Sequence, residues 1–128
     1  MTDPVAAPAP LRVLLVDPDD CVRESLAGLL CIGHKCLVIG TAGTADGAVR
    51  LAAETAPDVV VVDPRLPGID GSALIARLRA VARDTRVLVL NWSETADLTI
   101  GADAYARKTF RPHEQIDAVL ATTHRPLD

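Results

Sequence analysis

The chain has 128 residues, 49% of them hydrophobic, with one Trp, one Tyr and one Phe, so we expect a single domain with an aliphatic core. A formal net charge of −4 and the lack of any basic run argue against direct nucleic-acid binding by this domain. No apolar stretch approaches the roughly 20 residues of a membrane helix, and residues 1–10 lack the basic start and apolar run of a signal peptide.

Strand and helix signals alternate along the chain. In chain order the predicted elements are a strand at Leu11–Val16, a helix at Cys21–Leu30, a strand at Cys36–Ile39, a helix at Ala45–Thr55, a strand at Val59–Val62, a helix at Gly71–Ala82, strands at Arg86–Leu90 and Ala104–Ala106, and a last helix from Pro112. This alternation with short connections predicts the doubly wound α/β class, a parallel sheet with helices on both faces.

A few residues mark the expected boundaries and buried faces. Asp20 occupies the position of an N-cap for the first helix, and Gly40 is expected to close the second strand. Four consecutive valines at Val59–Val62 require burial on both faces of that strand. The third helix is expected to turn Leu74 and Val81 towards the core.

The folded domain is predicted over residues 11–122, between a disordered Pro/Ala tail at 1–10 and a frayed end at 123–128. The three cysteines are an odd number without CxxC spacing. In the absence of an export signal, they indicate reduced thiols and a cytoplasmic location.

Polar residues follow the predicted strands. Asp17 follows the first strand, Asp63 the third and Asn91 the fourth, and Lys108 comes shortly after the fifth. Water at the strand ends explains any one of them, but two carboxylates beside one lysine indicate a site, because ligands of such sheets bind outside the carboxyl ends of the strands.

Paired carboxylates repel each other unless a cation intervenes, and here the cation would be Lys108 or a bound Mg²⁺. Such a site favours an incoming phosphoryl group. A carboxylate can attack phosphorus to give an acyl phosphate, and the Lys108 ammonium would offset the developing charge.

Three segments resemble the receiver domain of two-component response regulators. They are Val16-Asp17 with Val22-Arg23-Glu24-Ser25-Leu26, the stretch Pro57–Gly71 (PDVVVVDPRLPGIDG), and the stretch Gly101–Lys108 (GADAYARK). The middle segment is the most specific, because an Asp, a Pro-Gly and an Asp-Gly occur in one register. The resemblance covers about residues 11–122. A proline at the position of Pro112 resembles the pattern of receivers that precede a helix-turn-helix output domain.

The resemblance implies a CheY-like, five-stranded parallel sheet in the order 2-1-3-4-5. Asp63 matches the phosphoacceptor, Lys108 the phosphate-pairing lysine and Tyr105 the switch aromatic. Asp17 matches the first residue of the acidic pair, and Arg65 the position whose backbone carbonyl binds the metal.

The acidic pocket departs from the family pattern. Pro18 stands where receivers have their second acid, and the following Asp19 and Asp20 are the available replacements. We therefore expect Mg²⁺, held by Asp17, Asp63 and the Arg65 carbonyl, to bind weakly or not at all.

The fourth strand and its connection depart as well. Asn91 replaces the Ser or Thr of the switch, and Trp92 replaces a small residue at the mouth of the site. The nine residues Trp92–Ile100 leave room for a shortened fourth helix only, a stub at Glu94–Ile100.

The resemblance implies a non-enzymatic receiver in a phosphorelay, modified at Asp63 by a sensor histidine kinase or contacted by another signalling protein. Homodimer formation and a DNA-binding output domain outside this sequence are further implications; a membrane partner is not expected. One alternative is a pseudo-receiver that binds partners without phosphorylation. The other is a small phosphatase of the haloacid-dehalogenase type, whose DxD motif resembles Asp17-Pro18-Asp19, with Asp17 as nucleophile and Asp19 as acid.

Cys31, His34 and Cys36 lie within six residues and include soft metal ligands. A structural zinc site requires four ligands, so these three residues are only a weak indication of zinc. We expect Cys36 to pack into the sheet as a small core residue, as free cysteines commonly do.

Overall fold

The structure, a computed structural model, describes residues 9–92 and 101–123. The predicted stub at Glu94–Ile100 lies outside these residues, as does most of both predicted tails. In chain order the elements are β1 (Leu11–Val16), α1 (Asp20–Leu30), the 3-10 turn η1 (Ile32–His34), β2 (Cys36–Ala42), α2 (Ala45–Thr55), β3 (Val59–Val62), α3 (Gly71–Val81), β4 (Arg86–Asn91), β5 (Ala104–Arg107) and α4 (Pro112–Thr123).

The strands form one parallel sheet in the order β2-β1-β3-β4-β5. This confirms the predicted doubly wound fold and its strand order. The chain reverses its direction of travel across the sheet between β1 and β3, so the carboxyl ends of these two strands form the switch point at which such sheets bind ligands.

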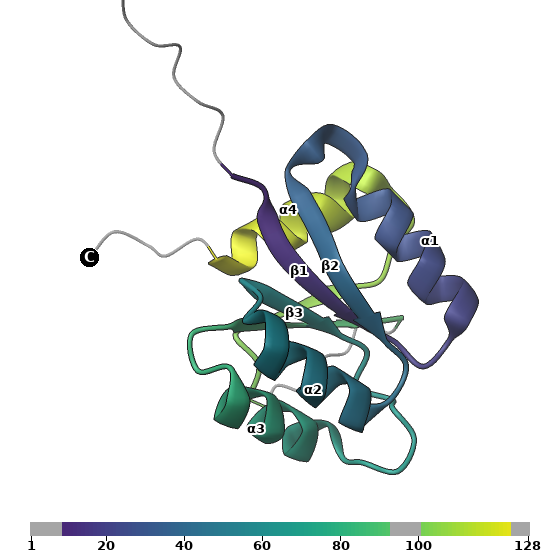
Figure 1. The fold of residues 1–128 in the computed structure, drawn as a ribbon. Helices are drawn as coiled ribbons and strands as arrows, with labels where there is room; N and C mark the ends of the chain where they lie inside the picture. Colours follow the sequence, from purple (N-terminus) through teal and green to yellow (C-terminus); the bar gives the residue numbers. More distant parts are fainter. Residues whose placement is uncertain (1–8, 93–100, 124–128) are drawn as a thin grey trace, which may run out of the picture.

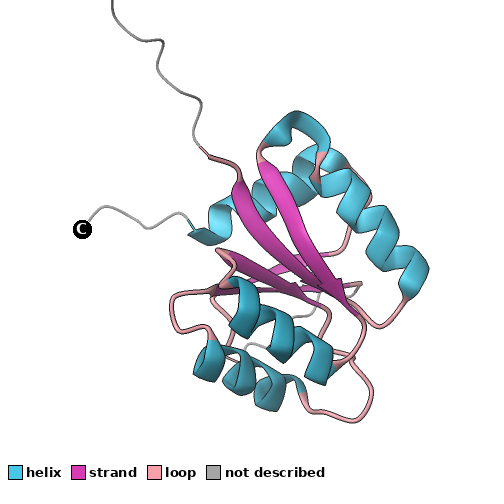
Figure 2. Ribbon diagram, viewed as in Figure 1, coloured by secondary structure: helices cyan, strands magenta, loops and turns pink. Residues whose placement is uncertain are grey.

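Helices cover both faces of the sheet. Figure 1 shows α1 and α4 on one side and α2 and α3 on the other, and Figure 2 shows the strands enclosed between these layers. The residues of Val59–Val62 alternate between the two buried clusters and are at most 1% exposed. Burial on both faces explains why four consecutive β-branched residues suit this position.

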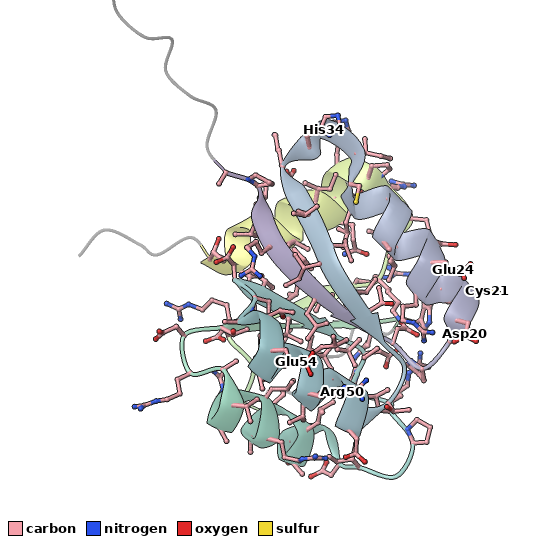
Figure 3. All side chains as sticks on the ribbon, viewed as in Figure 1. Asp20, Cys21, Glu24, His34, Arg50 and Glu54 are labelled. Atoms are coloured by element: carbon pink, nitrogen blue, oxygen red, sulfur yellow. The ribbon has the colours of Figure 1, made fainter. Side chains whose placement is uncertain are left out.

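The first helix is capped one residue earlier than predicted. Asp19 is the N-cap, since its carboxylate accepts a hydrogen bond from the Val22 amide at 3.0 Å. The prediction of Asp20 was wrong because its carboxylate pairs with Arg23 instead. Figure 3 shows Asp20 at the outer end of α1.

The second strand also continues past its predicted end. The register between β1 and β2 shifts between Val13 and Leu14, which pair with Val38 and Gly40. Gly40 therefore lies at a bulge inside β2, a usual place for glycine in a strand, and does not close it.

Two helical expectations need correction. Val81 is 41% exposed, while Ile75 is 3% exposed and joins the core, because the buried stripe of α3 runs through Leu74, Ile75 and Leu78. The last helix runs to Thr123, one residue into the predicted frayed end.

Within residues 9–92 and 101–123, no helix has both the length and the hydropathy that crossing a membrane requires.

Candidate functional site

Three charged side chains meet at the carboxyl edge of the sheet. Asp17 follows β1, Asp63 follows β3 and Lys108 follows β5. The Lys108 Nζ lies 2.5 Å from Oδ2 of Asp17 and 2.6 Å from Oδ2 of Asp63. All three residues are at most 4% exposed. The structure therefore brings together the two carboxylates and the lysine that the strand ends indicated.

The sheet itself fixes the positions of these side chains. The Asp63 amide donates to the Val16 carbonyl at 2.9 Å, and the Lys108 amide donates to the Asn91 carbonyl at 2.7 Å. Each bond extends the hydrogen-bonding pattern of the sheet just beyond the end of a strand. The two side chains thus leave from rigid backbone, which holds their charges in a fixed geometry.

Arg65 also holds the Asp63 carboxylate. Its backbone amide and Nε donate to Oδ1 of Asp63 at 2.9 Å and 3.2 Å, and its Nη2 donates to Oδ2 at 3.0 Å. The guanidinium side chain is 60% exposed, whereas that of Asp63 is 1% exposed. Asp63 therefore sits between a buried ammonium and a guanidinium at the solvent edge.

These donors keep Asp63 ionised. Burial alone would raise the pKa of its carboxyl, but hydrogen bonds from Arg65 and Lys108 outweigh burial and hold the pKa below its ordinary value. The same contact raises the pKa of Arg65. The carboxylate is thus an anion at neutral pH, the form that a nucleophile requires.

The acids of the β1–α1 loop have separate tasks. Oδ1 of Asp17 accepts a hydrogen bond from the Asp19 amide at 2.9 Å, which shapes the loop. The Asp19 carboxylate caps α1, and Asp20 pairs with Arg23. Arg23 also donates to the Asp17 carbonyl at 2.7 Å, and a Cβ on Gly43 would lie only 2.7 Å from its Nη1. The Arg23 guanidinium therefore packs closely against the β2–α2 connection at Gly43, where only a glycine leaves it room.

One ring of an aromatic pair, that of Trp92, lies over the lysine. The Trp92 and Phe110 rings are 5.5 Å apart at a 42° tilt, and the Lys108 Nζ is 5.1 Å from the Trp92 ring. Both aromatic residues are nearly half exposed. Trp92 therefore covers the ammonium from the solvent side and forms a cation–π contact with it.

Residues 13–120 match the family model of the response regulator receiver domain. The chain belongs to this family. It is a receiver domain of the two-component phosphorelay type, as the sequence resemblance indicated. Receiver domains are generally signalling modules without enzymatic activity, and they interact with histidine kinases.

Similar proteins support the assignment. The transcriptional regulatory protein PrrA of Mycobacterium leprae is 38% identical over 120 residues, covering 89% of this chain and 50% of PrrA. LiaR of Bacillus subtilis is 33% identical over 118 residues, covering 88% and 56%. The response regulator domain of Thermotoga maritima CheB matches with a TM-score of 0.79 at 26% identity, covering 91% and 99%. The chain spans about half the length of the curated relatives it matches.

Receiver domains typically bind Mg²⁺ at their phosphorylation site, but the acids of the β1–α1 loop in this receiver already have other partners. Pro18 supplies no carboxylate, Asp19 caps a helix, and Asp20 pairs with Arg23. Among the residues that the structure describes, no group of three His, Cys, Asp or Glu side chains is arranged to hold a metal ion.

The two central carboxylates are also occupied. Oδ2 of Asp17 is buried without a hydrogen-bond partner of good geometry, which would suit a cation, but the Lys108 ammonium already pairs with it at 2.5 Å. Both oxygens of Asp63 accept hydrogen bonds from Arg65. Since Mg²⁺ requires a near-octahedral oxygen shell, this arrangement does not fit the metal; the Arg65 carbonyl as a ligand stays a prediction.

The residues predicted to relay a switch lie on the neighbouring strands β4 and β5. Asn91 ends β4, and its carbonyl holds the Lys108 amide. The Tyr105 hydroxyl accepts a hydrogen bond from the Ala102 amide at 3.1 Å, and its ring packs against the core beneath α2 and α3. Their switch roles remain predictions.

The cysteine and histidine cluster is not assembled as a site. Cys36 is 3% exposed, as expected for a core residue, whereas Cys31 and His34 are exposed. Figure 3 shows His34 in the turn beyond α1. All three cysteines are free thiols.

Sequence reasoning missed two arginine side chains. It gave Arg65 only a backbone role, although an arginine two residues after the acceptor can reach back to it. It also overlooked Arg23, whose spacing of three residues from Asp20 on a helix is a usual ion-pair spacing.

Proposed function

We propose that Asp63 is the phosphoacceptor of this receiver and that Lys108 pairs with the phosphoryl group. The observation that supports this most directly is the buried, ionised carboxylate of Asp63, whose Oδ2 lies 2.6 Å from the Lys108 Nζ. A buried carboxylate beside a fixed ammonium combines a nucleophile with a group that stabilises added negative charge.

The proposed chemistry is a phosphoryl transfer. An oxygen of Asp63 attacks phosphorus on the phosphohistidine of a sensor histidine kinase, or on a small donor such as acetyl phosphate. The bond from phosphorus to the donor breaks, and its electron pair leaves with the donor. Asp63 becomes an acyl phosphate, and the Lys108 ammonium faces the new oxygens. The Arg65 guanidinium, whose side chain is 60% exposed at the solvent edge, would have to exchange its contacts with the Asp63 carboxylate for contacts with the phosphoryl oxygens.

The test is an intact-mass measurement after incubation with acetyl phosphate, with and without Mg²⁺. We expect the mass of one phosphoryl group to be added to the native protein and to Asp70→Asn, a matched change at an exposed aspartate of the following loop. Asp63→Asn should gain no mass. The proposal fails if the native protein stays unmodified and beryllofluoride leaves the Trp92 fluorescence unchanged.

A phosphorylation-independent receiver is the second candidate. Its support is that Arg65 and Lys108 already engage both oxygens of Asp63, so the carboxylate has its charge and hydrogen bonds satisfied without a phosphoryl group. In that case a partner would bind the native protein and Asp63→Asn equally well. The phosphatase alternative has less support, because Asp19, its proposed acid, caps α1; steady turnover of a phosphate ester that Asp17→Asn abolishes would revive it.

We further propose a sensor histidine kinase as the phosphodonor and a cytoplasmic location, which the free thiols of all three cysteines support. PrrA and LiaR are transcriptional regulatory proteins about twice the length matched here. Their names support a DNA-binding output domain beyond this sequence, and homodimer formation is a further part of the proposal. Size measurement before and after acetyl phosphate treatment tests the last point.

A further inference from the structure

The site described above carries balanced charges. Among the residues that the structure describes, the groups in direct ionic contact at this edge are the carboxylates of Asp17 and Asp63, the ammonium of Lys108 and the guanidinium of Arg65. Two negative and two positive charges cancel. These four groups together therefore offer a divalent cation far less electrostatic attraction than two unpaired carboxylates would.

Arg65 neutralises Asp63 in a geometry that uses both carboxylate oxygens. Its Nε approaches Oδ1 at 3.2 Å and its Nη2 approaches Oδ2 at 3.0 Å, the bidentate arrangement that arginine forms with carboxylates. Its backbone amide adds a third bond, to Oδ1 at 2.9 Å. The lone pairs that a metal would take on Asp63 are thus already accepting hydrogen bonds.

The two cations that contact Asp63 differ in their exposure to solvent. The Lys108 side chain is 2% exposed, whereas that of Arg65 is 60% exposed. A metal ion would have to enter from solvent, and the group on that side is the guanidinium. The remaining acids of the β1–α1 loop are held by α1 and by Arg23, so they offer no replacement ligands.

We propose that the Arg65 guanidinium is the resident cation of this pocket and takes the place of the divalent ion that receiver domains typically bind. This proposal concerns the electrostatics of the pocket and holds whether or not Asp63 is phosphorylated. It predicts that divalent cations do not fill a site in the native protein, and that removal of the Arg65 side chain creates one.

The experiment titrates Mn²⁺, a paramagnetic stand-in for Mg²⁺, and counts the free ion by electron paramagnetic resonance. The proteins are native, Arg65→Ala, Arg65→Lys, and the double variant Arg65→Ala with Asp17→Asn. Arg77→Ala is the matched control, because Arg77 is also a partly exposed arginine paired with an aspartate, Asp46, but lies on α3 away from the pocket.

We expect Arg65→Ala to bind one Mn²⁺ at least about tenfold more tightly than the native protein, because a contact charge has been removed and both Asp63 oxygens are freed. Excess Mg²⁺ should displace the ion. Arg77→Ala should bind Mn²⁺ like the native protein. The affinity of Arg65→Lys should lie between those of the native protein and Arg65→Ala, since lysine keeps the charge but lacks the paired donors of the guanidinium. The added Asp17→Asn change should abolish the gain.

Three outcomes would overturn the proposal. One is tight Mn²⁺ binding by the native protein that Asp63→Asn removes, a result that needs no Arg65 variant to fold. Another is an equal gain in Arg65→Ala and Arg77→Ala, which would reflect net charge alone. The third is no gain in a folded Arg65→Ala protein. None of these depends on phosphorylation, so a failed acetyl phosphate experiment would leave this inference standing.

Discussion

Lys108 is the residue on which the buried charges depend. One ammonium, 2% exposed, contacts two carboxylates that are themselves at most 2% exposed. Ions in such surroundings are costly unless they are paired, and removal of one partner leaves an uncompensated charge. With Lys108 gone, Asp17 would lose its ionic partner, and Asp63 would keep only Arg65 at the solvent edge.

We therefore expect Lys108→Met to lower the free energy of unfolding at pH 7 by about 3 kcal/mol or more. In the native protein the pKa of Asp63 is lowered by its donors, so its contribution to stability is present above the unfolded pKa of about 3.9 and is lost as pH falls through the folded pKa. In the variant that pKa rises, so protonation relieves the buried charge. The stability difference between variant and native should therefore shrink as pH falls from 7 through the raised pKa of Asp63 in the variant.

Urea denaturation at several pH values measures this difference. Lys35→Met is the matched control, because Lys35 is exposed, and a surface change of this kind usually stays within about 0.5 kcal/mol. A pH-independent loss in Lys108→Met would mean that lost packing, not unpaired charge, causes the destabilisation.

Which site residues the sequence could predict follows from how each is positioned. Asp17, Asp63 and Lys108 were predictable because a parallel sheet brings its strand ends to one edge, whatever the side chains do. The Arg65 contact was not, because it depends on the rotamer of a long, exposed side chain. Choosing Asp19 over Asp20 as the cap also depends on a local competition with Arg23 that spacing does not decide.

At the scale of elements, the C-terminal end of α2 has a strained backbone conformation that a substitution can relieve. Ala56 is the C-cap with φ 45° and ψ 63°, the left-handed region that costs an L-residue with a Cβ roughly 1–2 kcal/mol. Arg12 holds this end in place, since its guanidinium donates to the carbonyls of Thr55 and Ala56 at 2.7 Å and 2.9 Å. The contacts use backbone oxygens, so they survive a change of side chain at this position.

We expect Ala56→Gly to raise the free energy of unfolding by about 0.5–1 kcal/mol, the relief of the left-handed strain less the greater freedom of glycine in the unfolded chain. The control is the same substitution at Ala53, an exposed position inside α2. There it should destabilise by about 1 kcal/mol. Opposite signs in thermal or urea unfolding would establish the cause; loss of stability in both would contradict it.

The sequence predicted best the elements whose residues must all be buried. Four consecutive valines at Val59–Val62 predict a strand covered on both faces, and all four side chains are buried. The second strand was misjudged at Gly40 because a bulge arises from the register of two strands, which no single segment contains.

At the scale of the whole molecule, the sheet links two cores that lie on opposite faces. Leu26 of α1 belongs to one cluster and Leu74 of α3 to the other, and both are at most 1% exposed. The central strands contribute alternate residues to both clusters, as the valines of β3 show. Neither face can lose its packing without withdrawing support from strands that the other face needs, so the domain should unfold as one unit.

Leu26→Ala and Leu74→Ala are therefore expected to lower the free energy of unfolding by comparable amounts, about 2–5 kcal/mol each. In each variant the urea midpoint should fall while the slope m stays unchanged. Far-UV circular dichroism reports the helices, and the fluorescence of Trp92, the one tryptophan of the chain, reports the edge of the site; the two transitions should coincide in the native protein and in both variants. A variant in which one signal is lost before the other would show that the faces unfold separately, and the charged pocket would then be supported by one layer of helices rather than by the whole sheet.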